Sequence, residues 1–165
     1  MNNDTLYNIL FCGIGGQGVL KASEICGLAA LADGYHVKKS EVHGMAQRGG
    51  SVESHLRFGD AVRSPLVIPG QADFLVCFHA DEADRLSHFL RPEGVSFRHF
   101  LDEFSSSGID RRFLNTWFLG ILSAHLPMTQ ESWLEALAAA FKREQVRNRE
   151  VFLDGARVGS ERTPA

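Results

Sequence analysis

Short apolar runs that end at glycine alternate with longer amphipathic stretches along this chain. The run Tyr7 to Cys12 is apolar and stops at glycine, which predicts a short buried strand. Apolar positions at helical spacing predict a helix over residues 18 to 33, and Gly34 follows where a helix C-terminal glycine is expected. Residues 35 to 39 predict a second strand, which would close a βαβ unit through a right-handed crossover.

The later part of the chain repeats this alternation. Residues 52 to 58 place Val52, Ser54, Leu56 and Phe58 on one side and charged residues on the other, which predicts a strand with one solvent-facing side. Further along the chain we expect a strand at 74–78 and helices at 80–90, 115–126 and 130–147. The last of these helices would have Thr129 as its N-cap. Its buried face would be formed by Leu134, Leu137, Ala138 and Phe141.

Two segments show no clear pattern. Residues 96 to 114 mix phenylalanines, charges and a turn-like SSSG, and the end of the chain from Gly155 is expected to fray. The sequence therefore predicts a single α/β domain over residues 1–165. We expect a three-layer, Rossmann-like architecture in which helices sandwich a mostly parallel, or mixed, sheet.

Composition narrows the class of protein. The 165 residues are 44% hydrophobic and 22% charged, and a net charge of −3 argues against a general nucleic-acid binder. The apolar runs are too short to cross a bilayer and no signal peptide is visible, so a cytoplasmic protein is expected. Cys12, Cys26 and Cys77 form no C-x-x-C pair and are expected to be buried small hydrophobes, with no metal site.

The stretch GIGGQG carries the first candidate chemistry. Gly13, Gly15 and Gly18 form the spacing G-x-G-x-x-G between a predicted strand and a predicted helix, with Gly16 and Gln17 inside it. Glycine tolerates positive φ and lets a ligand approach the backbone closely. The free N–H groups of the following helix favour an anion such as a phosphate. These five residues are the predicted cofactor-binding set.

The carboxylate that a dinucleotide fold uses for ribose is harder to find. It should close the second strand about 20 residues beyond the glycine motif. Glu41 lies near that distance, but it follows Lys38 and Lys39 and opens a polar loop. A free-standing nucleotide-binding domain and a tight turn that binds nothing both stay open at this point.

A second loop, SEVHGMAQRGGS at residues 40–51, is polar, glycine-rich and about a dozen residues long. Loops of this length in compact domains are usually functional or disordered. It holds Glu41, His43, Gln47 and Arg48, and a βαβ fold would place it on the same rim as GIGGQG. His43 can titrate near neutral pH, and Arg48 has the planar fork that pairs with a carboxylate or a phosphate. We therefore predict these four as active-site residues.

The two motifs also carry a resemblance. GIGGQGVLKASEI together with VKKSEVHGMAQRGGSVESHLRFG resembles the small (beta) subunit of indolepyruvate:ferredoxin oxidoreductases and, more broadly, the gamma subunit or domain of 2-oxoacid:ferredoxin oxidoreductases. The likeness covers residues 8 to about 95 and resumes in NTWFLG and WLEALAAAFKREQVRNREVFLDG. Between them, RHFLDEFSSSGIDRRF is shorter than the family's usual segment, so a shortened fold is expected.

The resemblance implies oxidative decarboxylation of an aryl 2-oxoacid with coenzyme A, giving acyl-CoA, CO2 and reduced ferredoxin. Such chemistry needs thiamine diphosphate and iron–sulfur clusters, and this chain has neither a G-D-G…N motif nor a ferredoxin-like cysteine run. The resemblance implies that a large (alpha) subunit carries both cofactors and passes electrons to ferredoxin. This chain would then be an accessory subunit, inactive alone, with coenzyme A as a co-substrate at the glycine turn. A free-standing coenzyme-binding module and an interaction protein remain alternatives.

Overall fold

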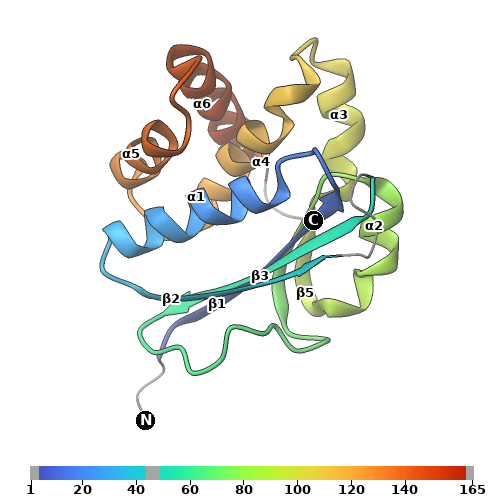
Figure 1. Ribbon diagram of the computed structural model, residues 1–165, viewed down its shortest axis with the longest axis vertical. Coiled ribbons are helices and arrows are strands. Elements are labelled where there is room, and N and C mark those ends of the chain that lie inside the picture. Colours follow the sequence, from blue (N-terminus) through green and yellow to red (C-terminus); the bar gives the residue numbers. More distant parts are fainter. Residues whose placement is uncertain (1–3, 44–48, 163–165) are drawn as a thin grey trace.

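The computed structural model describes residues 4–43 and 49–162. One sheet of five strands has the order β2-β3-β1-β4-β5 (Figure 1). Neighbours β1, β4 and β5 run parallel, whereas β3 is antiparallel to both β1 and β2. The strands are β1 (Leu6–Ile14), β2 (His36–His43), β3 (Ser51–Gly59), β4 (Ala72–Cys77) and β5 (Leu90–Ser96). The expected α/β sheet is confirmed in its mixed form.

The first two strands are not neighbours, contrary to the expected βαβ pairing. β3 lies between β1 and β2 and pairs with both of them. The physical reason is that Leu56 and Phe58 of β3 are fully buried, so this strand belongs in the middle of the sheet.

The prediction that one side of β3 faces solvent is also wrong, because His55 on that side is only 5% exposed. Residues 60–71 cover it, and the backbone N–H of Val67 donates to His55 Nδ1 (3.1 Å).

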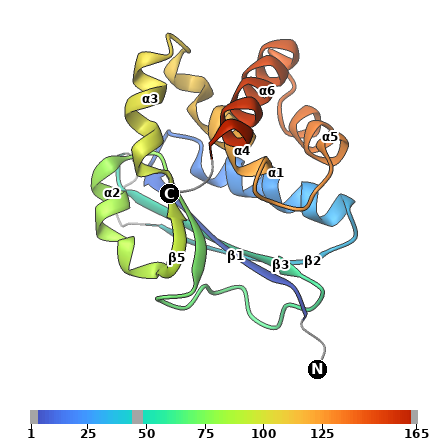
Figure 2. The same cartoon turned by 180° about the vertical axis from the view of Figure 1, so that it is seen from behind.

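Helices cover the two faces of the sheet unequally. Helices α1, α4, α5 and α6 gather on one side, while residues 60–71 cross the other side (Figures 1 and 2). The short helix α2 packs on β1 and β4. The fold therefore has three layers, and the layer opposite α1, α4, α5 and α6 is thin because residues 60–71 and the short helix α2 form it. The helices are α1 (Val19–Ala32), α2 (Ala80–Arg85), α3 (Phe100–Ser106), α4 (Leu114–Ser123), α5 (Gln130–Ala140) and α6 (Gln145–Glu161).

The predicted helix 130–147 is two helices. The backbone turns over residues 141–144, where Glu144 adopts a positive φ of 54°, and the Gln145 side chain donates to the Phe141 carbonyl (3.0 Å). The buried stripe of α5 includes Trp133, Ala136 and Leu137, so it is shifted from the predicted one. The prediction that the chain frays from Gly155 is also wrong, because helix α6 continues to Glu161.

The segment 96–114, which shows no pattern in the sequence, is held by its phenylalanines. Phe97, Phe100, Phe104 and Phe113 are all buried. The Phe104 ring lies 5.5 Å from Trp117 of α4, and the Phe100 ring lies 6.4 Å from it. Aromatic packing therefore fixes α3 and the turn before α4, although periodicity does not reveal them. Among the described residues, no helix is both long and apolar enough to cross a membrane.

Helices α4 and α6 touch backbone to backbone at Gly120 and Gly155. A Cβ on Gly120 would overlap the Phe152 carbonyl and lie 2.8 Å from the Ala156 nitrogen. We expect Gly120→Ala to lower the free energy of unfolding by roughly 1–3 kcal/mol, because the two helices must separate. Gly27→Ala in α1 is the matched control, since its Cβ would meet no atom closer than 3.4 Å. Urea unfolding of both variants checks this, and equal stabilities would contradict it.

Candidate functional site

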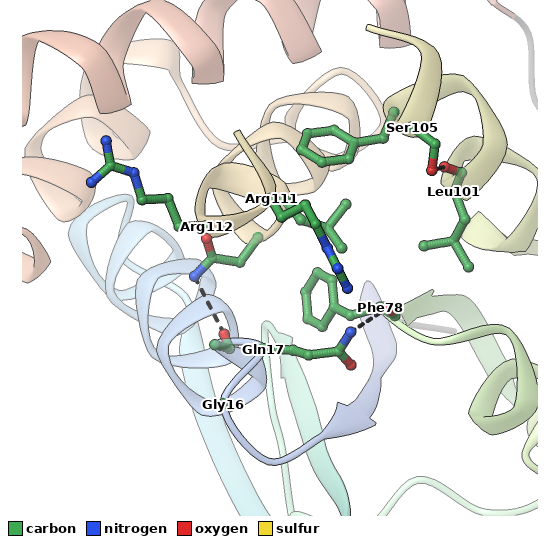
Figure 3. A pocket seen from close by; sticks show the side chains of 11 residues that line it. Gly16, Gln17, Phe78, Leu101, Ser105, Arg111 and Arg112 are labelled. Atoms are coloured by element: carbon green, nitrogen blue, oxygen red, sulfur yellow. Dashed lines mark hydrogen bonds between the residues drawn. The ribbon is translucent and has the colours of Figure 1, made fainter. Parts of the chain in front are cut away.

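The glycine turn between β1 and α1 is closed by one side chain. Gln17 Oε1 accepts a hydrogen bond from the Ile14 N–H (2.9 Å), and Gln17 Nε2 donates to the Phe78 carbonyl (2.8 Å) at the end of β4. Gly16 and Gly18 adopt φ values of 93° and 79°, which favour glycine. Gln17 therefore fixes both the shape of the turn and its place on the sheet (Figure 3).

Two of the predicted glycines have roles within the protein. A Cβ on Gly13 would lie 2.7 Å from Gln17 Oε1 and 3.2 Å from Phe78 Cβ, so this glycine makes room for the closing side chain. The Gly15 N–H donates to the Gly50 carbonyl (2.9 Å). That bond joins the glycine turn to the end of the second loop, which places the ends of the two glycine-rich segments on the same rim, as expected.

A pocket of about 400 Å³ opens beside this turn (Figure 3). Helices α1 and α4 both begin at it, and neither has a side chain capping its first turn from the N-cap position. Its lining comes from the glycine turn, the end of β4, α3 and the segment that enters α4. These residues are Gly16, Gln17, Gly18, Phe78, Leu101, Phe104, Ser105, Arg111, Arg112, Leu114 and Asn115.

The two arginines of the pocket differ in orientation. Arg111 extends toward Gln17 and Phe78, whereas Arg112 points away from them (Figure 3). Arg112 pairs with Glu144 (3.0 Å) and lies 4.9 Å from the Phe113 ring centre. Helix N-termini carry partial positive charge, and a guanidinium adds a full one. The pocket is therefore suited to an anion.

Arg111 is not among the residues that the sequence predicts for this site. It belongs to the segment without periodicity, so no pattern pointed to it. One local signal was available: Asp110 accepts a hydrogen bond from the Arg112 N–H (3.0 Å) and starts the turn that leads into α4. Asp two residues before a backbone N–H is a typical turn-starting residue. That signal places the arginines at a helix entry without showing that the entry faces GIGGQG.

The predicted active-site residues fall in two groups. Glu41 lies within strand β2 and not in a loop, and it is partly exposed and pairs with Lys39 (3.0 Å). His43 is the last residue of β2, in register with Val52. Gln47 and Arg48 lie outside the described residues. β2 is longer than expected because β3 pairs with it over its whole length. The catalytic roles of all four stay predictions.

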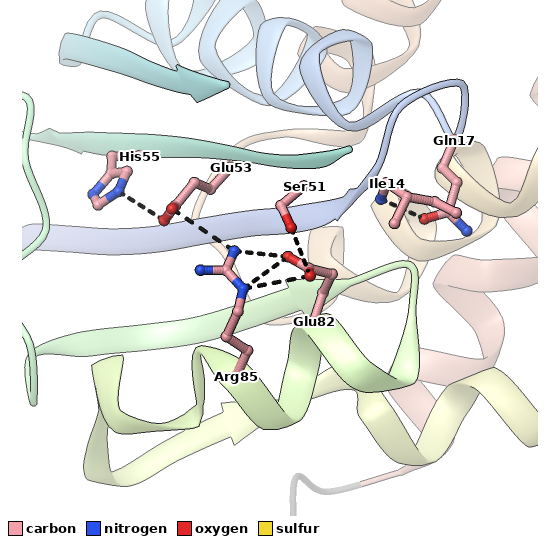
Figure 4. A network of polar contacts seen from close by, with 7 residues as sticks. All are labelled: Ile14, Gln17, Ser51, Glu53, His55, Glu82 and Arg85. Atoms are coloured by element: carbon pink, nitrogen blue, oxygen red, sulfur yellow. Dashed lines mark hydrogen bonds and ion pairs between the residues drawn. The ribbon is translucent and has the colours of Figure 1, made fainter. Parts of the chain in front are cut away.

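A polar network on the α2 side of the sheet was not predicted (Figure 4). Glu82 of α2 is 7% exposed and accepts hydrogen bonds from Ser51 Oγ (2.9 Å) and Arg85 Nη2 (2.7 Å). Arg85 also lies 3.8 Å from Glu53, which in turn lies 3.5 Å from His55 Nε2. Burial favours the neutral acid, but the bonds from Arg85 and Ser51 outweigh it and lower the pKa of Glu82. The network thus ties the start of β3, beside Gly50, to α2.

The three cysteines are fully buried, as expected. Burial raises the pKa of Cys12 and Cys26, and it raises the pKa of Cys77 to about 12. Cys12 and Cys77 lie side by side on the parallel strands β1 and β4. Buried thiols with raised pKa values are poor nucleophiles and poor metal ligands. Among the residues that the structure describes, no group of three His, Cys, Asp or Glu side chains could hold a metal ion.

Comparison with known proteins identifies the family. The model of the pyruvate ferredoxin/flavodoxin oxidoreductase family matches residues 8–98, which include both glycine-rich segments. The chain belongs to this family. Over 91 residues it is 47% identical to the indolepyruvate oxidoreductase subunit IorB of Pyrococcus horikoshii, covering 55% of this chain and 45% of the relative. The IorB of Archaeoglobus fulgidus is 51% identical over 83 residues, covering 50% and 41%. The chain spans less than half the length of these curated relatives.

Solved structures share the fold. The keto/oxoacid ferredoxin oxidoreductase gamma subunit of Geobacter sulfurreducens aligns with a TM-score of 0.74 at 22% identity, over 94% of this chain and 99% of that one. The 2-oxoglutarate:ferredoxin oxidoreductase of Magnetococcus marinus, solved with 2-oxoglutarate, coenzyme A and succinyl-CoA, aligns with a TM-score of 0.74 at 16% identity. That match covers 97% of this chain and 32% of the larger one. This chain therefore shares the fold of the Geobacter sulfurreducens protein over nearly the full length of both chains.

Replacing the closing side chain tests the turn. We expect Gln17→Met to lower the free energy of unfolding by about 1–3 kcal/mol, because the Ile14 N–H and the Phe78 carbonyl lose their partner. Gln71→Met, at an exposed glutamine, is the control and should leave stability unchanged. Thermal and urea unfolding measure both. A wild-type stability for Gln17→Met would show that the side chain does not close the turn.

The Glu82 network predicts a pH dependence. Because the folded-state pKa of Glu82 lies below its ordinary value of 4.5, its stabilisation is complete above about pH 4.5 and is lost as the pH falls through the lowered value. At neutral pH, Glu82→Gln should cost roughly 1–3 kcal/mol, since it loses hydrogen bonds made to a charge. The difference from wild type should shrink in acid. Glu24→Gln, at an exposed residue of α1, should show little cost at any pH. A pH-independent cost at Glu82 would contradict the ionised network.

Proposed function

We propose that this chain is the accessory subunit of an indolepyruvate-type (aryl 2-oxoacid):ferredoxin oxidoreductase. The observation that carries the proposal is the identity of 46–51% to four IorB subunits over half of the chain. The family match includes both glycine-rich segments, and the Gly15–Gly50 bond connects them at one rim. This likeness weighs against a free-standing nucleotide-binding module.

The proposed reaction decarboxylates an aryl 2-oxoacid and transfers its acyl group to coenzyme A while ferredoxin takes the electrons. It needs a thiamine ylid and one-electron carriers, which side chains do not provide. The three thiols of this chain are buried in β1, α1 and β4, with raised pKa values, so they are unsuited to holding an iron–sulfur cluster. A large subunit would therefore supply thiamine diphosphate and the clusters. The cytoplasmic location expected from the sequence remains a prediction.

Within such a complex, the carboxyl end of the sheet is the part of this chain that we propose faces the chemistry. The glycine turn and its pocket would receive coenzyme A, whose phosphates suit the starts of α1 and α4. Glu41, His43, Gln47 and Arg48 would line the rim shared with the large subunit. Arg48 would hold a carboxylate or phosphate through two parallel hydrogen bonds. The polar network around Glu82 would keep the start of β3 in place beside this rim.

Co-expression with a large subunit tests the proposal. A thiamine- and iron–sulfur-type large subunit encoded beside this chain should co-elute with it as a brown complex. That complex should reduce ferredoxin with indolepyruvate only when coenzyme A is present. The chain alone should be colourless and inactive, even with thiamine diphosphate added. Activity of the chain alone, or full activity of the large subunit without it, would contradict the accessory role.

A further inference from the structure

Strand β2 has an open outer edge. It ends the sheet, and β3 pairs with its inner edge in an unbroken register from His36 to His43. No other backbone segment in the described part of the chain pairs with it. The opposite edge strand, β5, contains Pro92 and a register shift against β4, two features that protect a sheet edge from further pairing. β2 has neither, so its eight residues can accept another strand.

The side chains of β2 alternate between the two faces of the sheet. Val37 faces α1, because a Cβ on Gly27 of that helix would lie 3.5 Å from its Cγ1 atom. Lys39 and Glu41 therefore share this face, and they form an ion pair of 3.0 Å along the strand. Lys38 faces the opposite side, where its ammonium donates to a backbone carbonyl (3.2 Å). The α1 face of the edge thus carries one positive and one negative charge, two residues apart.

The alternation restricts how two copies of this edge can pair. Copies that extend one sheet through the same edge run antiparallel, and residues that lie opposite each other point to the same face. Odd-numbered residues of β2 face α1 and even-numbered residues face away from it, so opposite residues must both be odd or both be even. The twofold axis between the copies therefore passes beside a single residue, which lies opposite its own copy.

Charge selects one of the possible axes. Four axis positions overlap more than half of β2, namely Lys38, Lys39, Ser40 and Glu41. An axis at either lysine or at the glutamate sets that charge opposite itself, which destabilises the pairing. An axis at Ser40 instead sets Lys39 of each copy opposite Glu41 of the other. The two cross-strand pairs and the ion pair within each strand then form a ring of alternating charges.

Two exposed leucines of α1 lie beside the same edge. Leu28 and Leu31 are 38% and 55% exposed. On one side of this helix Asp33 accepts hydrogen bonds from the start of α5, and on the other side Gly27 faces β2. Helical spacing places both leucines next to Gly27, on the side away from α5. A second copy on the β2 edge brings its own α1 to this side, so the leucines of the two copies bury each other.

We propose that two copies of this chain dimerise through the outer edges of their β2 strands, with the twofold axis at Ser40. The five strands of each copy then join into one continuous sheet. Lys39 of each copy pairs with Glu41 of the other, and the exposed leucines of the two α1 helices pack together. The proposal does not depend on the proposed function, since it needs only this chain.

Sedimentation velocity of the full chain, from micromolar to millimolar concentration, tests the dimer. The wild type should associate into a dimer within this range. Lys39→Glu and Glu41→Lys should each raise the dissociation constant about tenfold or more, because each change turns both cross-strand pairs into like charges. Leu31→Lys should also weaken the dimer, because it places a charge between the two α1 helices.

Mixing the two charge variants tests the register itself. In an equimolar mixture of Lys39→Glu and Glu41→Lys, one chain is acidic at both positions and the other is basic at both. An axis at Ser40 sets every acidic residue opposite a basic one, so the mixture should form a heterodimer about as tightly as the wild type forms its dimer. Neither variant alone should do so.

Lys142→Glu is the matched control, because it makes the same charge change at an exposed lysine between α5 and α6. It should change the dissociation constant less than twofold. At concentrations where the chains are monomeric, all variants should melt like the wild type, because the changed side chains lie at the surface.

Three results would overturn the proposal. The first is a wild-type chain that stays monomeric at millimolar concentration. The second is a dimer that neither charge variant weakens, or that Lys142→Glu weakens as much. The third is a mixture of the two charge variants that associates no better than either variant alone, which would reject the axis at Ser40.

Discussion

The Gln17 side chain makes the two hydrogen bonds on which the geometry of the rim depends. It satisfies the Ile14 N–H and the Phe78 carbonyl, so the end of β1, the glycine turn and the end of β4 are held in one arrangement. Left unpaired, those partly buried backbone groups would favour another turn. With the turn fixed, α1 starts over the carboxyl end of the sheet, where parallel strands place ligands in α/β folds.

The other side of the pocket depends on hydrophobic packing far from it in sequence. Phe100 and Phe104 pack on Trp117, and α4 packs backbone to backbone on α6 through Gly120 and Gly155. These contacts hold the start of α4, and with it the segment that bears Arg111, against the glycine turn. The stability of the fold and the shape of the pocket are thus linked, because Phe104, which packs on Trp117, also lines the pocket.

The sequence predicts those parts of the fold that follow from local pattern. The strand before GIGGQG, helix α1 and the class of fold are visible because apolar periodicity and glycine spacing are local signals. The position of β3 between β1 and β2 was not predictable, because strand order depends on which faces become buried. The break at residues 141–144 was missed for a similar reason: it is stabilised by a side chain that returns to the Phe141 carbonyl.

The candidate site shows the same division. Gly16, Gln17 and Gly18 were predictable from spacing, and the structure brings them to a pocket. Arg111 and Glu82 were not, because each reaches the rim from a distant segment through tertiary packing. Gly13 was assigned to a ligand on spacing, whereas the structure gives it a packing role beside Gln17. The GIGGQG motif thus identifies the turn in the sequence, but only the folded structure shows which residues from distant segments lie around it.

Hydrogen exchange of the assembled complex, with and without coenzyme A, measures most directly whether the glycine turn and the Arg111 segment form one coenzyme-facing surface. Peptides covering residues 13–18 and 111–115 should gain protection together when coenzyme A is added. The peptide covering 145–161, on the far side of α4, should not change. Coenzyme A that binds the complex without protecting either segment, or that protects only another face of this chain, would contradict this structural explanation.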